Sequence, residues 1–106
     1  MSIYEIENKN ILTKMIDACE EANKLLVIKV SSTWCSPCKA IKPKYKELAE
    51  KYQNIVFTTF DVDEQEELAE LFNISSIPTF IVIKDRNIIK RSEGTDLSSI
   101  IYLFEL

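Results

Sequence analysis

The chain has 106 residues, a net charge of −4, 46% hydrophobic residues, one glycine and three prolines. This length fits one domain over residues 1–106, and the acidic charge argues against nucleic-acid binding, which needs clustered basic side chains. No run approaches the roughly 18 consecutive apolar residues of a membrane span, so no membrane partner is expected. Three cysteines do not make a secreted disulfide framework, and the acidic N-terminus lacks a signal-peptide pattern. We therefore expect a cytoplasmic protein.

Strand-like and helix-like segments alternate along the chain. Short apolar or alternating runs predict five strands, at 3–6, 25–30, 55–60, 78–84 and 87–91. Apolar residues at helical spacing predict four helices, at 11–23, 36–52, 64–72 and 97–104. Asn10 and Asp96 are placed to cap the first and the last of these helices. The pattern predicts an α/β fold with a central mixed, mostly parallel β-sheet and helices on both faces.

Two cysteines, Cys35 and Cys38, stand at the start of the second predicted helix, just after the buried strand at 25–30. The first N–H groups of a helix lack intrahelical partners, and the positive end of the helix dipole lies there. Both effects favour a thiolate over a thiol at Cys35. Cys38, one turn later, can then displace a partner captured by Cys35, which is dithiol–disulfide exchange.

The alternative for Cys35 and Cys38 is a structural or metal-binding pair. A zinc site normally needs four ligands, whereas the chain has no histidine and no second Cys-X-X-Cys motif, so no metal is expected. The third cysteine, Cys19, lies on the apolar face of the first predicted helix. It is interpreted as a core residue, since free cysteines are often buried; oxidation or a dimer link is the alternative.

The chain resembles the thioredoxin family over nearly its whole length. The family's landmarks occur in order and at fitting spacing: Trp34, Cys35, Cys38, Lys39, Pro43, the segment 60–63, the Ile77-Pro78-Thr79 element and Gly94. This resemblance implies a thioredoxin-like fold, a cis bond before Pro78, and a redox disulfide between Cys35 and Cys38. It also implies that Cys35 is the attacking thiol and Cys38 the buried resolving thiol.

The same resemblance implies a protein-disulfide reductase that binds no cofactor and is recycled by an external reductant. Its partners would be disulfide-containing proteins and a thioredoxin reductase, and the protein would be a monomer. The surface that contacts substrate would include Trp34, Ser36, Pro37, Ile77, Pro78, Thr79 and Gly94. A thioredoxin-fold binding or assembly protein with a vestigial dithiol, or a disulfide isomerase or oxidase, is the alternative function.

Lys29 is the largest departure from the family pattern, because it stands where the family carries a buried Asp that helps deprotonate the resolving thiol. Lys29 is a candidate catalytic residue with three alternative roles. It can act as a neutral base, it can stay charged and favour the Cys38 thiolate, or it can reach solvent and take no part in the chemistry.

Smaller departures surround the motif. Ser36 replaces the family's usual glycine, so we expect a somewhat less reducing dithiol. Asn87 is expected to adopt a left-handed conformation in place of a missing turn glycine.

Asp61 and Asp63 end a strand near the site, either as capping or solvated carboxylates or as a proton relay. Trp34 serves either as packing or as a docking residue.

Overall fold

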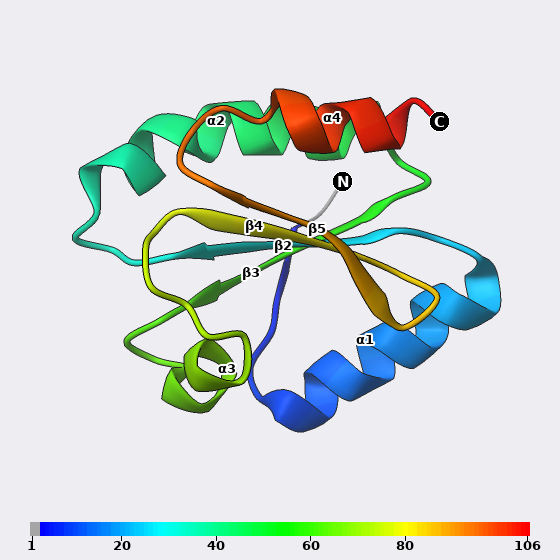
Figure 1. Cartoon of the computed structure of the whole chain (residues 1–106), viewed down its shortest axis with the longest axis horizontal. Coiled ribbons are helices and arrows are strands. Elements are labelled where there is room, and N and C mark those ends of the chain that lie inside the picture. Colours follow the sequence, from blue (N-terminus) through cyan, green and yellow to red (C-terminus); the bar gives the residue numbers. More distant parts are fainter. Residues whose placement is uncertain (1–2) are drawn as a thin grey trace.

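The computed structural model describes residues 3–106 and places five strands in one central sheet (Figure 1). The strands are β1 (Tyr4–Glu5), β2 (Leu26–Ser31), β3 (Val56–Asp61), β4 (Thr79–Lys84) and β5 (Asn87–Glu93). Their order in the sheet is β1-β3-β2-β4-β5. β1 and β2 run parallel to β3, whereas β4 is antiparallel to β2 and β5 is antiparallel to β4. The predicted mixed sheet is confirmed, but parallel pairs do not outnumber antiparallel ones, because the β4–β5 hairpin joins β2 in the opposite direction.

Four helices cover both faces of the sheet, as predicted. They are α1 (Lys9–Ala22), α2 (Ser36–Lys51), α3 (Glu66–Leu71) and α4 (Ser98–Phe104). α2 and α4 lie on one face, and α1 and α3 lie on the other (Figure 1). Strand β2 is buried on both faces: Val27 packs in the core under α2 and α4, and Leu26 and Ile28 pack in the core beside α1 and α3. The continuous apolar run of β2 meets this requirement.

Helix α1 begins two residues earlier than the sequence indicates. Its cap is Asn8, whose extended backbone lets the side chain accept a 2.8 Å hydrogen bond from the Ile11 N–H. The prediction at Asn10 is wrong because the backbone turns helical directly after Asn8, which places Asn10 inside the first turn. At the last helix, the expected cap at Asp96 is wrong by one position, because the N-cap is Leu97, which makes no side-chain cap hydrogen bond. Asp96 precedes it, and its Oδ1 accepts from the Ser98 N–H at 3.0 Å.

The β4–β5 hairpin turns through Asp85 and Arg86, whose φ angles are 49° and 69°. A two-residue hairpin connection with both residues left-handed is a type I′ turn, which matches the twist of the strands. The left-handed conformation expected at Asn87 is therefore wrong. Asn87 begins β5 instead, and its side-chain amide donates to the Asp85 carbonyl at 2.9 Å.

Candidate functional site

Cys35 occupies the N-cap position of α2, directly after the loop that follows β2. Its Sγ accepts a hydrogen bond from the Cys38 N–H at 3.2 Å, which satisfies one of the unpartnered donors of the first helical turn. Pro37 stands in that same turn, where its missing N–H costs no intrahelical hydrogen bond. The helix-start geometry expected for a thiolate is therefore present.

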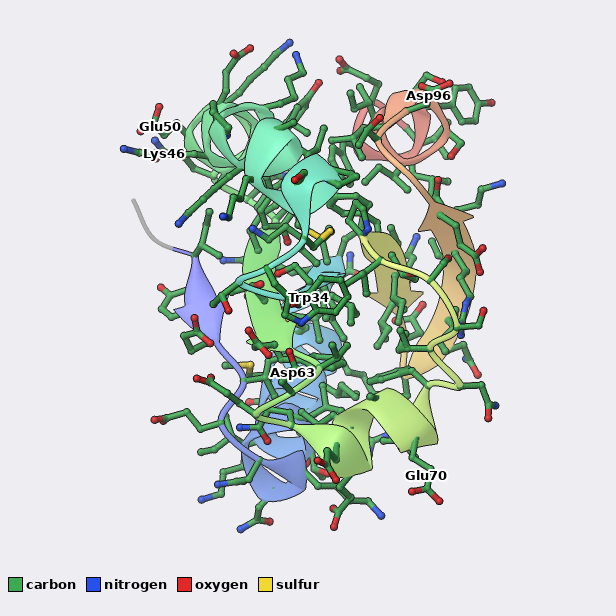
Figure 2. All side chains as sticks on the ribbon, turned by 90° about the vertical axis from the view of Figure 1, so that its left-hand side faces the viewer. Trp34, Lys46, Glu50, Asp63, Glu70 and Asp96 are labelled. Carbon is green, nitrogen blue, oxygen red and sulfur yellow. A yellow bond between two sulfur atoms is a disulfide. The ribbon has the colours of Figure 1, made fainter. Side chains whose placement is uncertain are left out.

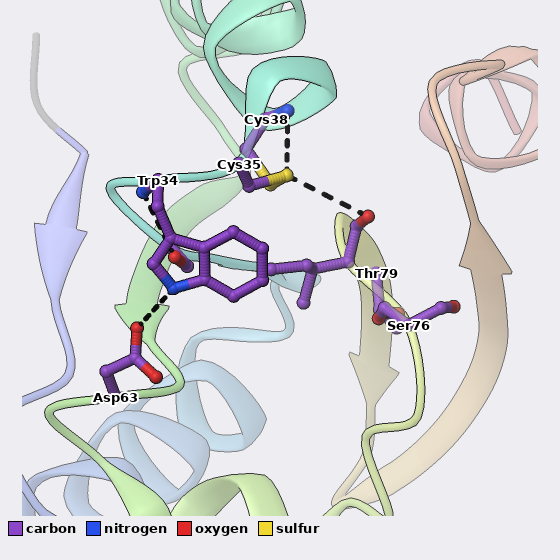
Figure 3. The surroundings of a disulfide bond; sticks show 8 residues. Trp34, Cys35, Cys38, Asp63, Ser76 and Thr79 are labelled. Atoms are coloured by element: carbon purple, nitrogen blue, oxygen red, sulfur yellow. Dashed lines mark hydrogen bonds between the residues drawn. A yellow bond between two sulfur atoms is a disulfide. The ribbon is translucent and has the colours of Figure 1, made fainter.

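Cys35 and Cys38 form a disulfide, with their Cα atoms 5.2 Å apart (Figure 3). Both residues are buried, with exposed fractions of 5% and 4%. The carbonyl oxygen of Ile77 lies 3.9 Å from Cys35 Sγ, although the two residues are 42 positions apart in sequence. The structure thus brings the Ile77-Pro78-Thr79 element to the dithiol.

The peptide bond between Ile77 and Pro78 is cis, as the resemblance implies. The Pro78 carbonyl accepts from the Gly94 N–H at 2.9 Å, which brings Gly94 to the same site. Gly94 has a φ of 92°, a conformation that suits glycine. Thr79 is fully buried, and its hydroxyl donates to the Ser76 carbonyl at 2.6 Å, so its side chain holds the loop that ends at the cis bond.

Trp34 is exposed to 67% and lies beside the disulfide. Its indole N–H donates to Asp63 Oδ2 at 2.7 Å, and both side chains lie at the end of the sheet where α2 begins (Figures 2 and 3). A ring this exposed is no core residue, which favours the docking interpretation of Trp34. The bond to Asp63 orients the indole ring, a role that the sequence analysis did not assign to this carboxylate.

Asp61 takes the capping role that was one of its two interpretations. Its Oδ1 accepts from the Asp63 N–H at 2.7 Å and from the Glu64 N–H at 3.3 Å, so it closes the turn after β3. This turn places Asp63 beside Trp34. Asp61 therefore stabilises the turn, and Asp63, placed by that turn, orients the indole ring of Trp34.

Lys29 is buried, with 6% of its surface exposed. Its Nζ lies 5.3 Å from the ring centroid of Tyr45, whose hydroxyl donates to the Thr58 carbonyl at 2.7 Å. Burial lowers the pKa of Lys29 below its usual 10.5; Lys42 lowers it further, and Glu5 opposes the shift. Such burial does not fit a lysine that reaches out to bulk solvent.

A cavity of about 480 Å³ brings Lys29 and Cys38 to one space. Lys42 lines it from α2, and Glu5 and Thr59 line it from β1 and β3. Glu5 and Lys29 both pair with Thr59 in the sheet register, so the three residues form one row across the strands. Both charged side chains therefore enter the surroundings of the buried thiol.

Cys19 lies away from this site. It is a free thiol on α1 with 6% exposure, in the core on the α1 and α3 face. Burial raises the pKa of Cys19, and the nearby Lys24 offsets part of that shift. The prediction of a core cysteine is confirmed.

Residues 3–106 contain no cluster of three His, Cys, Asp or Glu side chains able to hold a metal ion. Over the same span, no helix is long and apolar enough to cross a bilayer.

Comparison with known proteins agrees with this geometry. A sequence profile of the thioredoxin family, described as "Thioredoxin", matches residues 5–103. Thioredoxin H5 of Arabidopsis thaliana is 43% identical over 81 residues, covering 76% of this chain and 68% of that protein. Thioredoxin-1 of Caenorhabditis elegans is 41% identical over 75 residues, covering 71% and 65%.

Solved structures of thioredoxins superpose closely on the chain. The X-ray structure of Fasciola hepatica thioredoxin matches with a TM-score of 0.91 at 28% identity, over 97% of both chains. Reduced Schistosoma mansoni thioredoxin pre-protein matches with a TM-score of 0.89 at 35% identity, over 99% of this chain and 97% of that one.

Proposed function

Because the chain belongs to the thioredoxin family and is a thiol–disulfide oxidoreductase that reduces protein disulfides, we propose that Cys35 is its attacking thiol and Cys38 its resolving thiol. The observation that carries this assignment is the backbone N–H of Cys38 directed at Cys35 Sγ at the start of α2. This donor and the helix dipole stabilise a negative charge on Cys35. No equivalent donor to Cys38 Sγ is found within residues 3–106.

The reaction follows from these two roles. The Cys35 thiolate attacks one sulfur of the substrate disulfide, forming a mixed disulfide and releasing the first substrate thiolate. Cys38 then loses its proton and attacks Cys35 Sγ, which forms the Cys35–Cys38 disulfide and releases the second substrate thiolate. Two electrons pass from the dithiol to the substrate, and an external reductant restores the dithiol.

Substrate would bind as an extended segment across the surface beside the disulfide. The exposed Trp34 supplies a large, partly apolar ring held by Asp63. The backbone of Ile77, next to the cis bond, lies within 4 Å of Cys35 Sγ and is placed to pair with the segment that carries the attacked disulfide. Gly94 borders the same surface, and Ser36 and Pro37 form its edge at the helix start.

Lys29 would serve this reaction as a fixed cation that favours the Cys38 thiolate. Lys29 and Cys38 line the same cavity, where a lower dielectric strengthens the attraction between an ammonium group and a thiolate. In the family pattern a buried Asp helps deprotonate the resolving thiol, whereas Lys29 would stabilise the Cys38 thiolate directly. The neutral-base role stays an alternative, because the pKa of Lys29 is lowered by burial.

We further propose a cytoplasmic, monomeric protein recycled by a thioredoxin reductase, with disulfide-containing proteins as substrates. The three cysteines support a reducing compartment, since one pair is redox-active and the third is a buried thiol. An NADPH-coupled assay with a flavoprotein thioredoxin reductase tests the electron donor, and the absence of NADPH oxidation would contradict it.

Insulin reduction with dithiothreitol tests the central proposal. Wild type should precipitate the insulin B chain rapidly, and Cys35→Ser should do so no faster than dithiothreitol alone. Equal rates for the two proteins would instead favour a binding or assembly role with a vestigial dithiol. Equilibration of the dithiol against glutathione separates a reductase from an oxidase, because a strongly oxidising potential would reject the reductase.

A further inference from the structure

The segment 73–78, here called the cis-proline loop, connects α3 to β4 and carries Ile77 to the dithiol. Its path begins at the C-terminal end of α3, where Asn73 takes a left-handed conformation with a φ of 51°. The Asn73 and Ile74 N–H groups bond back to carbonyls of the helix, at 3.0 and 2.9 Å. The carbonyls of Phe72 and Asn73 lie beyond the helical ladder and need partners from elsewhere.

Arg91 supplies both partners. Its Nη1 donates to the Phe72 carbonyl, and its Nη2 donates to the Asn73 carbonyl at 2.8 Å. Arg91 belongs to β5, opposite Ile81 of β4, and so reaches from the sheet to the end of α3. A guanidinium group suits this task because it presents two donors in a fixed fork, and because a cation is favoured at a helix C-terminus.

The other end of the cis-proline loop is tied to the same part of the chain. The Gly94 N–H, directly after β5, donates to the Pro78 carbonyl at 2.9 Å. The Thr79 hydroxyl donates to the Ser76 carbonyl within the loop. The β5 region therefore holds the loop at both ends, and Ile77 lies between these anchors.

We propose that Arg91 is a positioning residue for substrate binding, because it fixes the start of the cis-proline loop and thereby the backbone of Ile77. Arg91 touches neither the disulfide nor the expected substrate. Its loss should weaken the binding of an extended protein segment without changing the chemistry of Cys35. This inference rests on the proposed pairing of substrate with Ile77.

Two substrates separate the binding of an extended segment from the thiol chemistry. Insulin has a polypeptide on both sides of its disulfides, whereas dithiobis-nitrobenzoate (DTNB) has none to pair with Ile77. Arg91→Gln should raise KM for insulin about three- to tenfold, as expected for losing hydrogen bonds from a charged donor. The reaction rate with DTNB should stay within about twofold of wild type. Arg91→Lys, which keeps the charge but loses the fork, should give an intermediate KM.

Arg86 provides a matched control in the same hairpin. It also contacts two acceptors, the carboxylates of Asp17 and Glu20, but it lies at the turn between β4 and β5. Arg86→Gln should leave KM for insulin unchanged. Amide hydrogen exchange at residues 74–77 gives a direct measure, since it should become faster in Arg91→Gln and stay unchanged in Arg86→Gln.

Two results would overturn the proposal: an unchanged KM for insulin in folded Arg91→Lys and Arg91→Gln, or an equal loss of rate with insulin and DTNB. If Arg91→Gln does not fold, Arg91→Lys and its hydrogen exchange decide the question alone. Failure of the wild-type protein to reduce insulin would instead contradict the proposed function. Hydrogen exchange would then still show whether Arg91 fixes the loop.

Discussion

Cys19 in α1 and the Cys35–Cys38 pair at the start of α2 are buried to nearly the same degree, yet their surroundings differ in kind. Cys19 lies among apolar side chains, and burial raises its pKa despite the nearby Lys24. Cys35 faces a backbone N–H, and Cys38 shares a cavity with Lys29. The difference teaches that burial alone does not decide whether a thiol reacts; the donors and charges around the sulfur decide it.

Replacing Cys35 and Cys19 one at a time should give the largest difference between the two thiol regions. Cys35→Ser should lower the rate of insulin reduction by at least about a hundredfold, because the nucleophile is lost. Cys19→Ser should leave the rate unchanged, since Cys19 lies in the core away from the dithiol. A large loss of rate in folded Cys19→Ser would mean that the two thiol regions are coupled.

Alkylation of the reduced protein measures the reactivity of Cys35 and Cys19 directly. Iodoacetamide should modify Cys35 near neutral pH and leave Cys19 unmodified, because the raised pKa of Cys19 keeps it a thiol, whereas a backbone N–H at the helix start favours the Cys35 thiolate. Cys19 should react only after denaturation. Mass spectrometry of the labelled peptides checks this order, and early labelling of Cys19 would contradict it.

Lys29→Met tests whether the charge in the cavity distinguishes Cys38 from Cys19. Without the ammonium group, the Cys38 thiolate loses a favourable interaction, so the resolving step should slow about five- to tenfold near neutral pH. The second phase of nitrothiobenzoate release from DTNB measures this step, and the first phase measures attack by Cys35. Lys42→Met, exposed on the same cavity, serves as the control and should slow the second phase less.

The same variant should be more stable than wild type. The pKa of Lys29 is lowered in the folded protein, so its charge opposes folding at neutral pH, and this cost is relieved as pH rises toward 10.5. Lys29→Met should therefore raise the free energy of unfolding by about 1–2 kcal/mol near pH 7, with a smaller gain at high pH. Urea unfolding at two pH values measures it, and a loss of stability would contradict the sign.

Glu5→Gln should give the smallest effect. Glu5 raises the pKa of Lys29 against the effects of burial and Lys42, so its removal should lower that pKa further. The pH dependence of the second DTNB phase should then shift to lower pH. An unchanged profile would show that Glu5 and Lys29 do not interact across Thr59.

Features set by a few neighbouring residues could be predicted from the sequence. The helix start at Cys35 and the two-sided burial of β2 each depend on short segments whose chemistry is local. The cis bond before Pro78 followed from the family resemblance rather than from local chemistry.

Features that join distant segments could not be predicted in this way. The bond between Trp34 and Asp63, and the two bonds of Arg91 to the end of α3, depend on how separate elements pack. The choice of Asn8 over Asn10 depended on where the chain leaves β1, because both residue types make good caps. Lys29 was recognised as unusual, but its burial and its place in the row with Glu5 required the sheet register.

The short length of β1 affects how readily this edge of the sheet can pair with another chain. An edge strand exposes unpaired backbone N–H and C=O groups, with which an extended segment of another chain can pair. β1 lies at one edge of the sheet and has only two residues, one of them the charged Glu5. Short, charged borders of this kind are a known defence against edge-to-edge aggregation.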